Sequence, residues 1–194
     1  PRLQLRQPLM GTWVDLTVAD GGGRALAAEV EQAFAEMHRL ARLMSRFEPD
    51  GVVGRINQQA GRGSVEVPPE LMAVLEFARD RAGQTGGAFD PVLGQLTAQV
   101  DPGAARLDDA HRRRYVAHAG IRTLELDAAR SRARLHDPLA RLDLGGVAKL
   151  PILAAGVRRL TQAGVSGCLI NGGGDVIATP RADGAAWRIG VRDA

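Results

Sequence analysis

The sequence predicts an α+β fold, in which a mixed sheet packs with helices. Apolar and polar residues alternate over 10–18, which is typical of a strand. Apolar residues three and four positions apart over 26–44 are typical of an amphipathic helix. The predicted strands and helices do not alternate strictly along the chain, which favours α+β over a repeated strand–helix architecture. With 194 residues the chain can bury a sizeable core, and we expect a single domain over 1–194.

The first half predicts one strand followed mainly by helices. The strand over 10–18 carries Val14, Leu16 and Val18 on one face. After a glycine turn at 21–23, the first helix ends near Ser45. A loop with a short helix around 52–57 follows. Pro68-Pro69 then opens another helix, because the first helical turn leaves its N–H groups unpaired in any case. The apolar stripes of the two long helices are Leu26, Val30, Phe34, Met37, Leu40 and Met44, and Leu71, Val74, Leu75 and Ala78.

The second half predicts short helices, a hairpin and a closing set of strands. We expect a weak helix from 91 to about 99, and a helix over 107–118 that Gly120 caps in the left-handed conformation. The strands are expected at 123–127, 132–137, 141–144, 166–171, 176–177 and 186–191, with a helix over 148–163. The last of these strands has the pattern of one in mid-sheet, so we expect more polypeptide to follow it.

Composition argues against several classes of function. Basic residues are interleaved with acidic ones, and aromatic residues total 4%, so no basic-aromatic pattern indicates nucleic-acid binding. No stretch approaches the roughly 18 apolar residues of a transmembrane helix. The lone cysteine, Cys168, excludes an intrachain disulfide, and its apolar neighbours favour a small buried side chain. The four histidines show neither metalloprotease spacing nor a nucleophilic serine motif, so a hydrolase is disfavoured.

The segment LDLGGVAKL at 142–150 is the most informative stretch. Lys149 is the single lysine among 24 arginines, and it follows a predicted strand and the pair Gly145-Gly146. Unpaired N–H groups at the start of a helix attract phosphate, and Lys149 adds a compact positive charge. Asp143 can accept from a ribose, a base amine or a metal-bound water. The P-loop and dinucleotide spacings are absent, so the pattern alone leaves open both phosphate binding and a tight structural turn.

Two other glycine-rich segments follow or interrupt predicted elements. In NGGGD at 171–175, three glycines between apolar segments indicate a sharp bend or close packing. Asp175 is either functional or bonded to the N–H groups of its own turn, and we favour the second role. In the segment 86–91, the default roles are a core position for Phe89 and a helix cap for Asp90.

Five segments, taken in order, resemble the FAD:protein FMN transferases of the ApbE type, the flavin transferases formerly called the thiamine biosynthesis lipoprotein family. They are Met10-Gly11-Thr12, Met44 to Asp50 with Arg55-Ile56-Asn57, Gly87-Ala88-Phe89-Asp90-Pro91, Leu142 to Lys149, and Asn171 to Asp175. Each segment alone is weakly specific. Five in register over residues 10–175 are strongly specific.

The resemblance implies a substrate, a metal and a reaction. It implies FAD contacts at Met10, Phe47, Ala88, Phe89, Asp90, Asp143 and Lys149. It also implies a Mg²⁺ ion near Gly146, held through main-chain oxygen because glycine has no side chain. The implied reaction cleaves the FAD pyrophosphate and attaches FMN through a phosphodiester to a Thr or Ser hydroxyl of an acceptor protein. A divalent cation neutralises the charge that develops in such a transfer. No catalytic residue is assigned.

Two departures from the family pattern keep other functions open. Family members usually continue after the lysine with Gly-Tyr and then an acidic residue, whereas this chain has Leu150-Pro151 and, a little later, Ala154. Proline is tolerated only in the first turn of a helix, so we expect the helix to begin at about this point. The second departure is that the family's later half, with the Asp/Thr motif that completes the magnesium site, is absent from this sequence, so we expect the remaining metal ligands to lie beyond residue 194. The alternatives are a flavin-binding module or degenerate paralogue that holds FAD without transfer, and a structural domain with no ligand.

Location follows only from the resemblance. It implies the periplasm or cell envelope, with a lipoprotein anchor outside the given sequence. Residues 1–9 lack the apolar run of a signal peptide, so the sequence itself leaves the compartment open. The acceptor protein and the oligomeric state are likewise not specified by the sequence.

Overall fold

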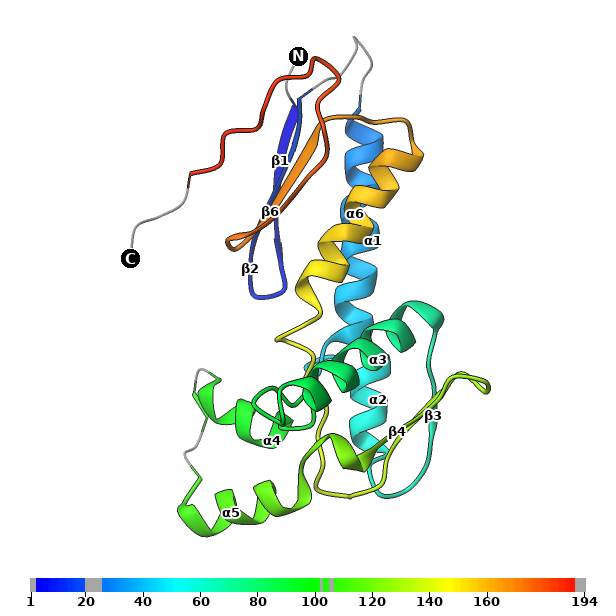
Figure 1. The fold of residues 1–194 in the computed structure, drawn as a ribbon, viewed down its shortest axis with the longest axis vertical. Helices are drawn as coiled ribbons and strands as arrows, with labels where there is room; N and C mark the ends of the chain where they lie inside the picture. Colours follow the sequence, from blue (N-terminus) through cyan, green and yellow to red (C-terminus); the bar gives the residue numbers. More distant parts are fainter. Residues whose placement is uncertain (1–2, 20–25, 102, 105–106, 191–194) are drawn as a thin grey trace. The chain divides into compact units, whose positions relative to one another are not determined.

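The computed structural model describes residues 3–19, 26–101, 103–104 and 107–190 (Figure 1). The chain divides into two compact units. The first unit consists of residues 1–41 and 149–194, and the second of residues 42–148. None of the helices in the described ranges is both long enough and apolar enough to cross a bilayer.

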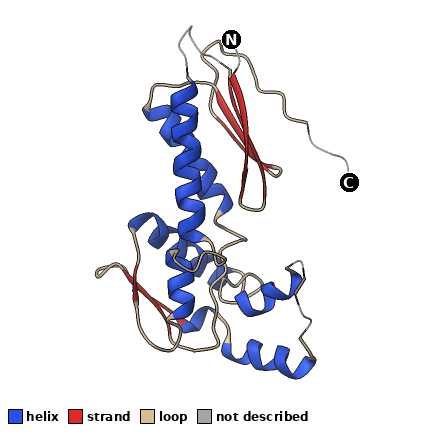
Figure 2. Cartoon of the chain, turned by 180° about the vertical axis from the view of Figure 1, so that it is seen from behind, coloured by secondary structure: helices blue, strands red, loops and turns tan. Residues whose placement is uncertain are grey.

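The first unit is an antiparallel sheet with two helices on one face. Its strands are β1 (Leu3–Leu9), β2 (Thr12–Val18), β6 (Cys168–Gly172) and β7 (Asp175–Ala178), which lie side by side in the order β1-β2-β6-β7. Helix α1 (Ala27–Met44) gives this unit its residues up to Ala41, and helix α6 is Lys149–Gln162. Both views show α1 and α6 beside the same face of the sheet (Figures 1 and 2).

Close packing between these helices and the sheet depends on glycine. A Cβ atom at Gly156 of α6 would lie 2.7 Å from Sδ of Met37 in α1 and 3.2 Å from Cδ1 of Ile170 in β6. A Cβ at Gly172 would lie 2.9 Å from Leu153. The sheet face beneath is apolar, and its innermost side chains are fully buried: Val14, Leu16, Val18, Cys168 and Ile170. The glycines therefore let α6 approach both α1 and the sheet.

The second unit combines short helices with a three-stranded antiparallel sheet. Its helical elements are α2 (Val52–Gln58), α3 (Pro69–Gln84), α4 (Gly94–Thr97), η1 (Ala98–Val100), α5 (Asp109–His118) and η2 (Ile121–Thr123). Its strands are β3 (Val65–Glu66), β4 (Leu124–Asp127) and β5 (Arg132–Leu135), in the order β3-β5-β4.

Most of the predicted helices and the predicted hairpin are confirmed. All ten residues of the two predicted apolar stripes are buried. Helix α3 begins at Pro69, and α6 begins at Lys149 with Pro151 in its first turn, as the proline rule requires. Cys168 is a buried free thiol. Strand β1 is not among the predicted elements, although Leu3 and Leu5 alternate with polar residues. The glycine turn at 21–23 lies outside the described residues.

Three local predictions are wrong. Residues 141–144 form no strand, because Arg141 makes one isolated bridge with Leu93 and the next residue bonds to a side chain instead of a strand. Residues 186–190 form no strand either. Trp187 holds that segment by donating from Nε1 to the Thr179 carbonyl oxygen at 2.8 Å. Gly120 has φ 108° and ψ 152°, which is not the left-handed helical conformation.

Candidate functional site

An arginine at the start of the second unit joins two aspartates. Arg46 donates from Nη2 to both carboxylate oxygens of Asp101, at 2.6 and 2.7 Å, and its Nε lies 3.0 Å from Oδ2 of Asp143. The side chains of Arg46 and Asp143 are only 15% and 17% exposed. Thr97 donates its hydroxyl to Oδ2 of Asp143 at 2.5 Å, and Gly145 N donates to Oδ1 at 2.8 Å. Both oxygens of Asp143 are thus held in place.

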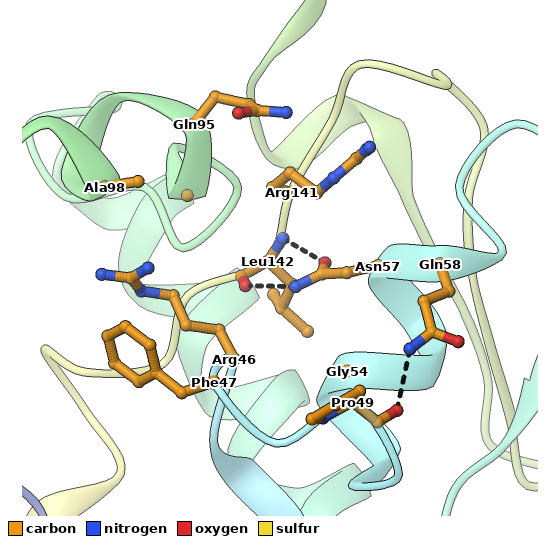
Figure 3. Close-up of a pocket in the computed structure, with 11 residues that line it drawn as sticks. Arg46, Phe47, Pro49, Gly54, Asn57, Gln58, Gln95, Ala98, Arg141 and Leu142 are labelled. Atoms are coloured by element: carbon orange, nitrogen blue, oxygen red, sulfur yellow. Dashed lines mark hydrogen bonds between the residues drawn. The ribbon is translucent and has the colours of Figure 1, made fainter. Parts of the chain in front are cut away.

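The extended segment that carries Asp143 is clamped from both sides. On one side, Asn57 of α2 donates from Nδ2 to the Leu142 carbonyl at 3.0 Å and accepts from Leu142 N at 2.7 Å, as a neighbouring strand would (Figure 3). On the other side, Asp143 N donates to the Pro91 carbonyl at 2.7 Å, and Gly94 N donates to Arg141 O at 2.8 Å. Backbone and side-chain hydrogen bonds together fix the position of the Asp143 backbone.

The loop over 85–91 is held by its own side chains. Thr85 accepts from Phe89 N at 3.1 Å. Asp90 accepts from Val92 N and from Ile121 N, each at 2.8 Å. Its carboxylate therefore ties this loop to the first N–H of η2, and it does not cap α4, the next helix in the chain. Phe89 is half-buried, and Ala88 is exposed.

Phe89 also meets the glycine pair that follows Asp143. A Cβ at Gly146 would lie 3.2 Å from Cε2 of the Phe89 ring. The glycine therefore leaves room for the aromatic ring against the turn. This contact brings together two of the sequence-predicted site residues that lie 57 positions apart in the chain.

A cavity of about 380 Å³ lies beside this network. Its walls come from the segment after α1, from α2, from α4 with η1, and from the segment before Asp143 (Figure 3). Phe47 stands next to it, 68% exposed, with the Arg46 guanidinium 4.0 Å from its ring centroid. The volume falls at the lower end of the roughly 300–1,000 Å³ typical of small-molecule sites.

In the first unit, one end of the sheet gathers the other motif residues. Lys149 Nζ lies 3.0 Å from Oδ2 of Asp175. Asn171 accepts from Gly174 N at 2.9 Å. Asn171 therefore caps the NGGGD turn, and the prediction that Asp175 does so is wrong. Asp175 instead pairs with the lysine, because the β6–β7 turn lies at the end of the sheet where α6 begins.

The hairpin turn between β1 and β2 lies at the same end. A Cβ at Gly173 would lie 2.7 Å from the hydroxyl oxygen of Thr12, which follows that turn. Met10 has φ 54° and Gly11 has φ 70°, the positive values that a two-residue type I′ turn requires. Positive φ is rare for a residue with a side chain such as methionine. The structure thus places Met10 and Lys149 at one end of the first unit.

The sequence-predicted FAD contacts therefore fall into two groups. Met10 and Lys149 belong to the first unit. Residues of the second unit make up the other group, which comprises Phe47, Ala88, Phe89, Asp90 and Asp143, together with the predicted metal position Gly146. Within that group, Arg46 links Phe47 to Asp143, and the Pro91 carbonyl links the 88–91 loop to Asp143.

The described residues do not by themselves form a magnesium site. They contain no cluster of three or more His, Cys, Asp or Glu side chains able to hold a metal ion. Gly146 offers a main-chain oxygen alone, and Asp143 already accepts from Thr97, from Gly145 N and from Arg46. Mg²⁺ prefers an octahedral set of oxygen ligands, which this arrangement does not supply.

Sequence reasoning missed several residues that build this network. Arg46 and Asn57 lie inside a motif that the sequence singles out, but neither was assigned a role. Asp101 and Thr97 have no local signal, because their partners lie 55 and 46 residues away. Arg141 and Gln95, which line the cavity, were also not predicted.

The fold defines a protein of the α+β class, and comparison with known proteins gives its family. The profile of the ApbE family matches residues 10–194. The chain belongs to the ApbE family. The FAD:protein FMN transferase of Rhodobacter capsulatus is 31% identical over 183 residues, which cover 91% of this chain and 34% of that protein. The FAD:protein FMN transferase of Treponema pallidum (strain Nichols) is 29% identical, with coverages of 86% and 51%.

Solved structures agree with the fold. The ApbE protein of Thermotoga maritima matches with a TM-score of 0.87 at 25% identity, over 100% of this chain and 64% of that one. The flavin transferase ApbE from Vibrio cholerae matches with a TM-score of 0.86 at 22% identity, over 98% and 63%. The predicted α+β class is confirmed. This chain spans about a third and about half of the two curated relatives, and less than two thirds of these structures.

Proposed function

We propose that the chain belongs to an FAD:protein FMN transferase, which moves FMN from FAD to a Thr or Ser hydroxyl of an acceptor protein. The observation that supports this most is the 31% identity to the Rhodobacter capsulatus FAD:protein FMN transferase over 91% of this chain. The clamped Asp143 and the cavity beside it supply a preorganised polar site of the kind that nucleotide binding needs.

The proposed reaction is a displacement at phosphorus. The acceptor hydroxyl oxygen bonds to the phosphorus of the FMN half, and the P–O bond that bridges the two phosphates breaks. AMP leaves with the electron pair of that bond, and the hydroxyl proton passes to a base or to solvent. Catalysis of such a step rests mainly on positioning and on stabilising negative charge. We assign no catalytic residue.

The chain's own residues bind and orient the donor. We propose that Asp143 accepts a hydrogen bond from FAD, with its orientation set by Thr97 and Gly145. Phe47 and Phe89 offer aromatic faces for stacking. We also propose FAD contacts at Ala88, Asp90, Met10 and Lys149. Lys149 would exchange part of its pairing with Asp175 for the pyrophosphate.

Magnesium dependence is proposed from the family resemblance. The ion would take the Gly146 main-chain oxygen as one ligand, and it would neutralise phosphate charge when bound. Periplasmic or envelope location, and a lipoprotein anchor, are proposals with the same basis. Fractionation of cells that produce the full-length protein tests the location.

A flavin-binding module without transfer activity is the second candidate. The sequence after Lys149 favours it, because Leu150 and Pro151, in the first turn of α6, depart from the Gly-Tyr of the family pattern that the sequence resembles. Ala154 departs from the acidic residue of the same pattern. Such a module would bind FAD and release it intact.

Mass spectrometry of an acceptor protein separates the two candidates. The full-length protein is incubated with FAD, Mg²⁺ and a candidate acceptor, and the acceptor is weighed before and after. A transferase adds an FMN-sized increment and releases AMP, and Asp143→Ala lowers the yield. An unmodified acceptor across a panel of Thr- and Ser-containing candidates, together with tight FAD binding and no AMP, would favour the module.

A further inference from the structure

Helix α5 of the second unit is exposed along its whole length (Figure 1). At its start, Asp108 accepts from His111 N at 2.8 Å, and at its end His118 Nδ1 lies 2.7 Å from Oδ2 of Asp137. None of its ten residues, all of which the structure describes, is buried, and only Tyr115 is even partly so. A helix of ten residues is marginally stable by itself. Contacts near its two ends therefore hold α5 and leave its outer face open.

The outer face of α5 carries two arginines between small residues. Because successive residues of a helix are rotated by roughly 100°, five exposed side chains of the last two turns lie on the side away from Tyr115. These five residues form the α5 surface: Ala110, Arg113, Arg114, Val116 and Ala117. The short alanine side chains let another protein approach the two guanidinium groups closely.

The two arginines of the α5 surface have no counter-charge within the part of the chain that the structure describes. Of the carboxylates at the start of the helix, Asp108 caps it and Asp109 pairs with Arg112 at 3.2 Å. Arg113 and Arg114 form neither an ion pair nor a hydrogen bond with any described residue. A guanidinium group can bind a carboxylate through two N–H donors at once. The α5 surface therefore complements a partner that carries carboxylates.

The surroundings of the two arginines favour an acidic protein over a lipid bilayer. A bilayer with anionic headgroups presents negative charge over a whole plane, which would repel the exposed Asp108 and Asp109. The one aromatic residue of α5, Tyr115, faces the other side of the helix and cannot enter the interface of a membrane. A protein can place carboxylates opposite Arg113 and Arg114 alone.

The α5 surface lies close to the clamped aspartate of the candidate site. Helix α5 packs against α4, and Thr97 of α4 donates its hydroxyl to Asp143. Transfer to a protein requires the acceptor to be held so that its hydroxyl reaches the donor. A protein bound at α5 would be held next to the element that orients Asp143.

We propose that the α5 surface docks the acceptor protein, through an acidic patch of that protein that pairs with Arg113 and Arg114. This proposal rests on the proposed function, because only a transferase has an acceptor. Unlike the residues proposed to contact FAD, the α5 surface touches neither the donor nor the reacting atoms. Its contribution is to attract and orient the second substrate.

Fluorescence anisotropy with synthetic peptides tests the proposal. The probe is a labelled peptide in which Asp and Glu flank a Thr, and its neutral counterpart has Asn and Gln in their place. We expect the full-length protein to bind the acidic peptide and not the neutral one, and to bind it more weakly as salt is added. Arg113→Gln combined with Arg114→Gln should weaken binding about fivefold or more, as expected for the loss of two exposed ion pairs.

A matched control and a charge reversal separate docking from folding. Arg158 and Arg159 of α6 are also adjacent and exposed, and their replacement by Gln should leave peptide binding unchanged. Arg113→Glu combined with Arg114→Glu should exchange binding of the acidic peptide for binding of a lysine counterpart, which an unfolded variant cannot do. Circular dichroism checks that each variant is folded.

Two results would overturn the proposal. One is a folded protein that does not bind the acidic peptide, or that binds it equally well after both arginines are replaced. The other is binding to vesicles that contain an anionic lipid, lost when Arg113 and Arg114 are replaced, in a protein that ignores the peptide. The second result would make the α5 surface a membrane contact.

The transfer assay distinguishes failure of this proposal from failure of the proposed function. In a protein that transfers FMN, replacing Arg113 and Arg114 by Gln should raise the KM for the acceptor about fivefold and leave kcat and FAD affinity unchanged. Transfer with an unchanged KM would support the enzyme and reject the docking surface. Arginine-dependent binding of the acidic peptide, with no FMN transfer and no AMP release, would support the docking surface and reject the enzyme.

Discussion

Asn57 provides the sharpest test of how the site is held, because one side chain replaces a whole neighbouring strand. Its amide donates to the Leu142 carbonyl and accepts from the Leu142 N–H, at 3.0 and 2.7 Å. Leu142 is fully buried, so water cannot easily replace either bond. Asn57→Ala therefore removes two hydrogen bonds and leaves a buried donor and a buried acceptor without partners.

The cost can be worked out from these two groups. An orphaned buried polar group costs about 1–3 kcal/mol, so the pair predicts a loss of about 3 kcal/mol in the free energy of unfolding. Asn57→Asp keeps the size of the side chain but places a carboxylate oxygen against the Leu142 carbonyl, so we expect a loss at least as large. Gln58→Ala is the matched control, because Gln58 makes one exposed bond to the Pro49 carbonyl.

Two measurements check this prediction. Urea unfolding followed by circular dichroism gives the change in stability, and hydrogen exchange reports on the Leu142 amide itself. We expect faster exchange at Leu142 in Asn57→Ala and unchanged exchange in Gln58→Ala. A stability change below about 0.5 kcal/mol, with Leu142 still protected, would refute the reasoning.

Three other predictions concern single residues. Arg46→Ala leaves the Asp101 and Asp143 carboxylates without their cation, so it should lower the free energy of unfolding by about 2 kcal/mol in urea titration. Arg46→Lys should recover only part of that loss, because an ammonium group cannot bridge both carboxylates as the planar guanidinium does. Met10→Gly should raise thermal stability by about 1 kcal/mol, since Met10 has φ 54°; a fall would contradict the strain argument. Burial raises the pKa of the Cys168 thiol, so the unfolded chain loses this proton first, and stability should fall as pH rises above about 8.5. Cys168→Ala should make stability fall less steeply with pH, and an equally steep fall in the variant would contradict this prediction.

Sequence periodicity was enough to locate the two long helices α1 and α3, because each buries one face. Leu26 to Met44 and Leu71 to Ala78 lie on those faces, and the structure buries them all. The proline at 151 fixed the start of α6 for a steric reason that is purely local. Such features depend on residues a few positions apart, which a sequence displays directly.

The site was harder to predict because its bonds are long-range. The extended conformation at 141–143 depends on Asn57, 85 residues earlier, and not on strand propensity. Asp175 does not cap its own turn as predicted, because it pairs with Lys149, and Asn171 caps the turn instead. Family motifs named Asp143 and Phe47, but the arginine that links them to each other and to Asp101 emerged only from the structure.

Equilibrium titration with FAD tests the central claim most directly. The original chain is compared with Asp143→Ala from the second unit and Lys149→Ala from the first, and Lys149→Arg shows whether a compact ammonium is needed. The account predicts that the original chain binds FAD and that each alanine variant binds it at least tenfold more weakly while remaining folded. Equal FAD affinity in all four proteins, or no FAD binding by the folded original chain, would contradict it.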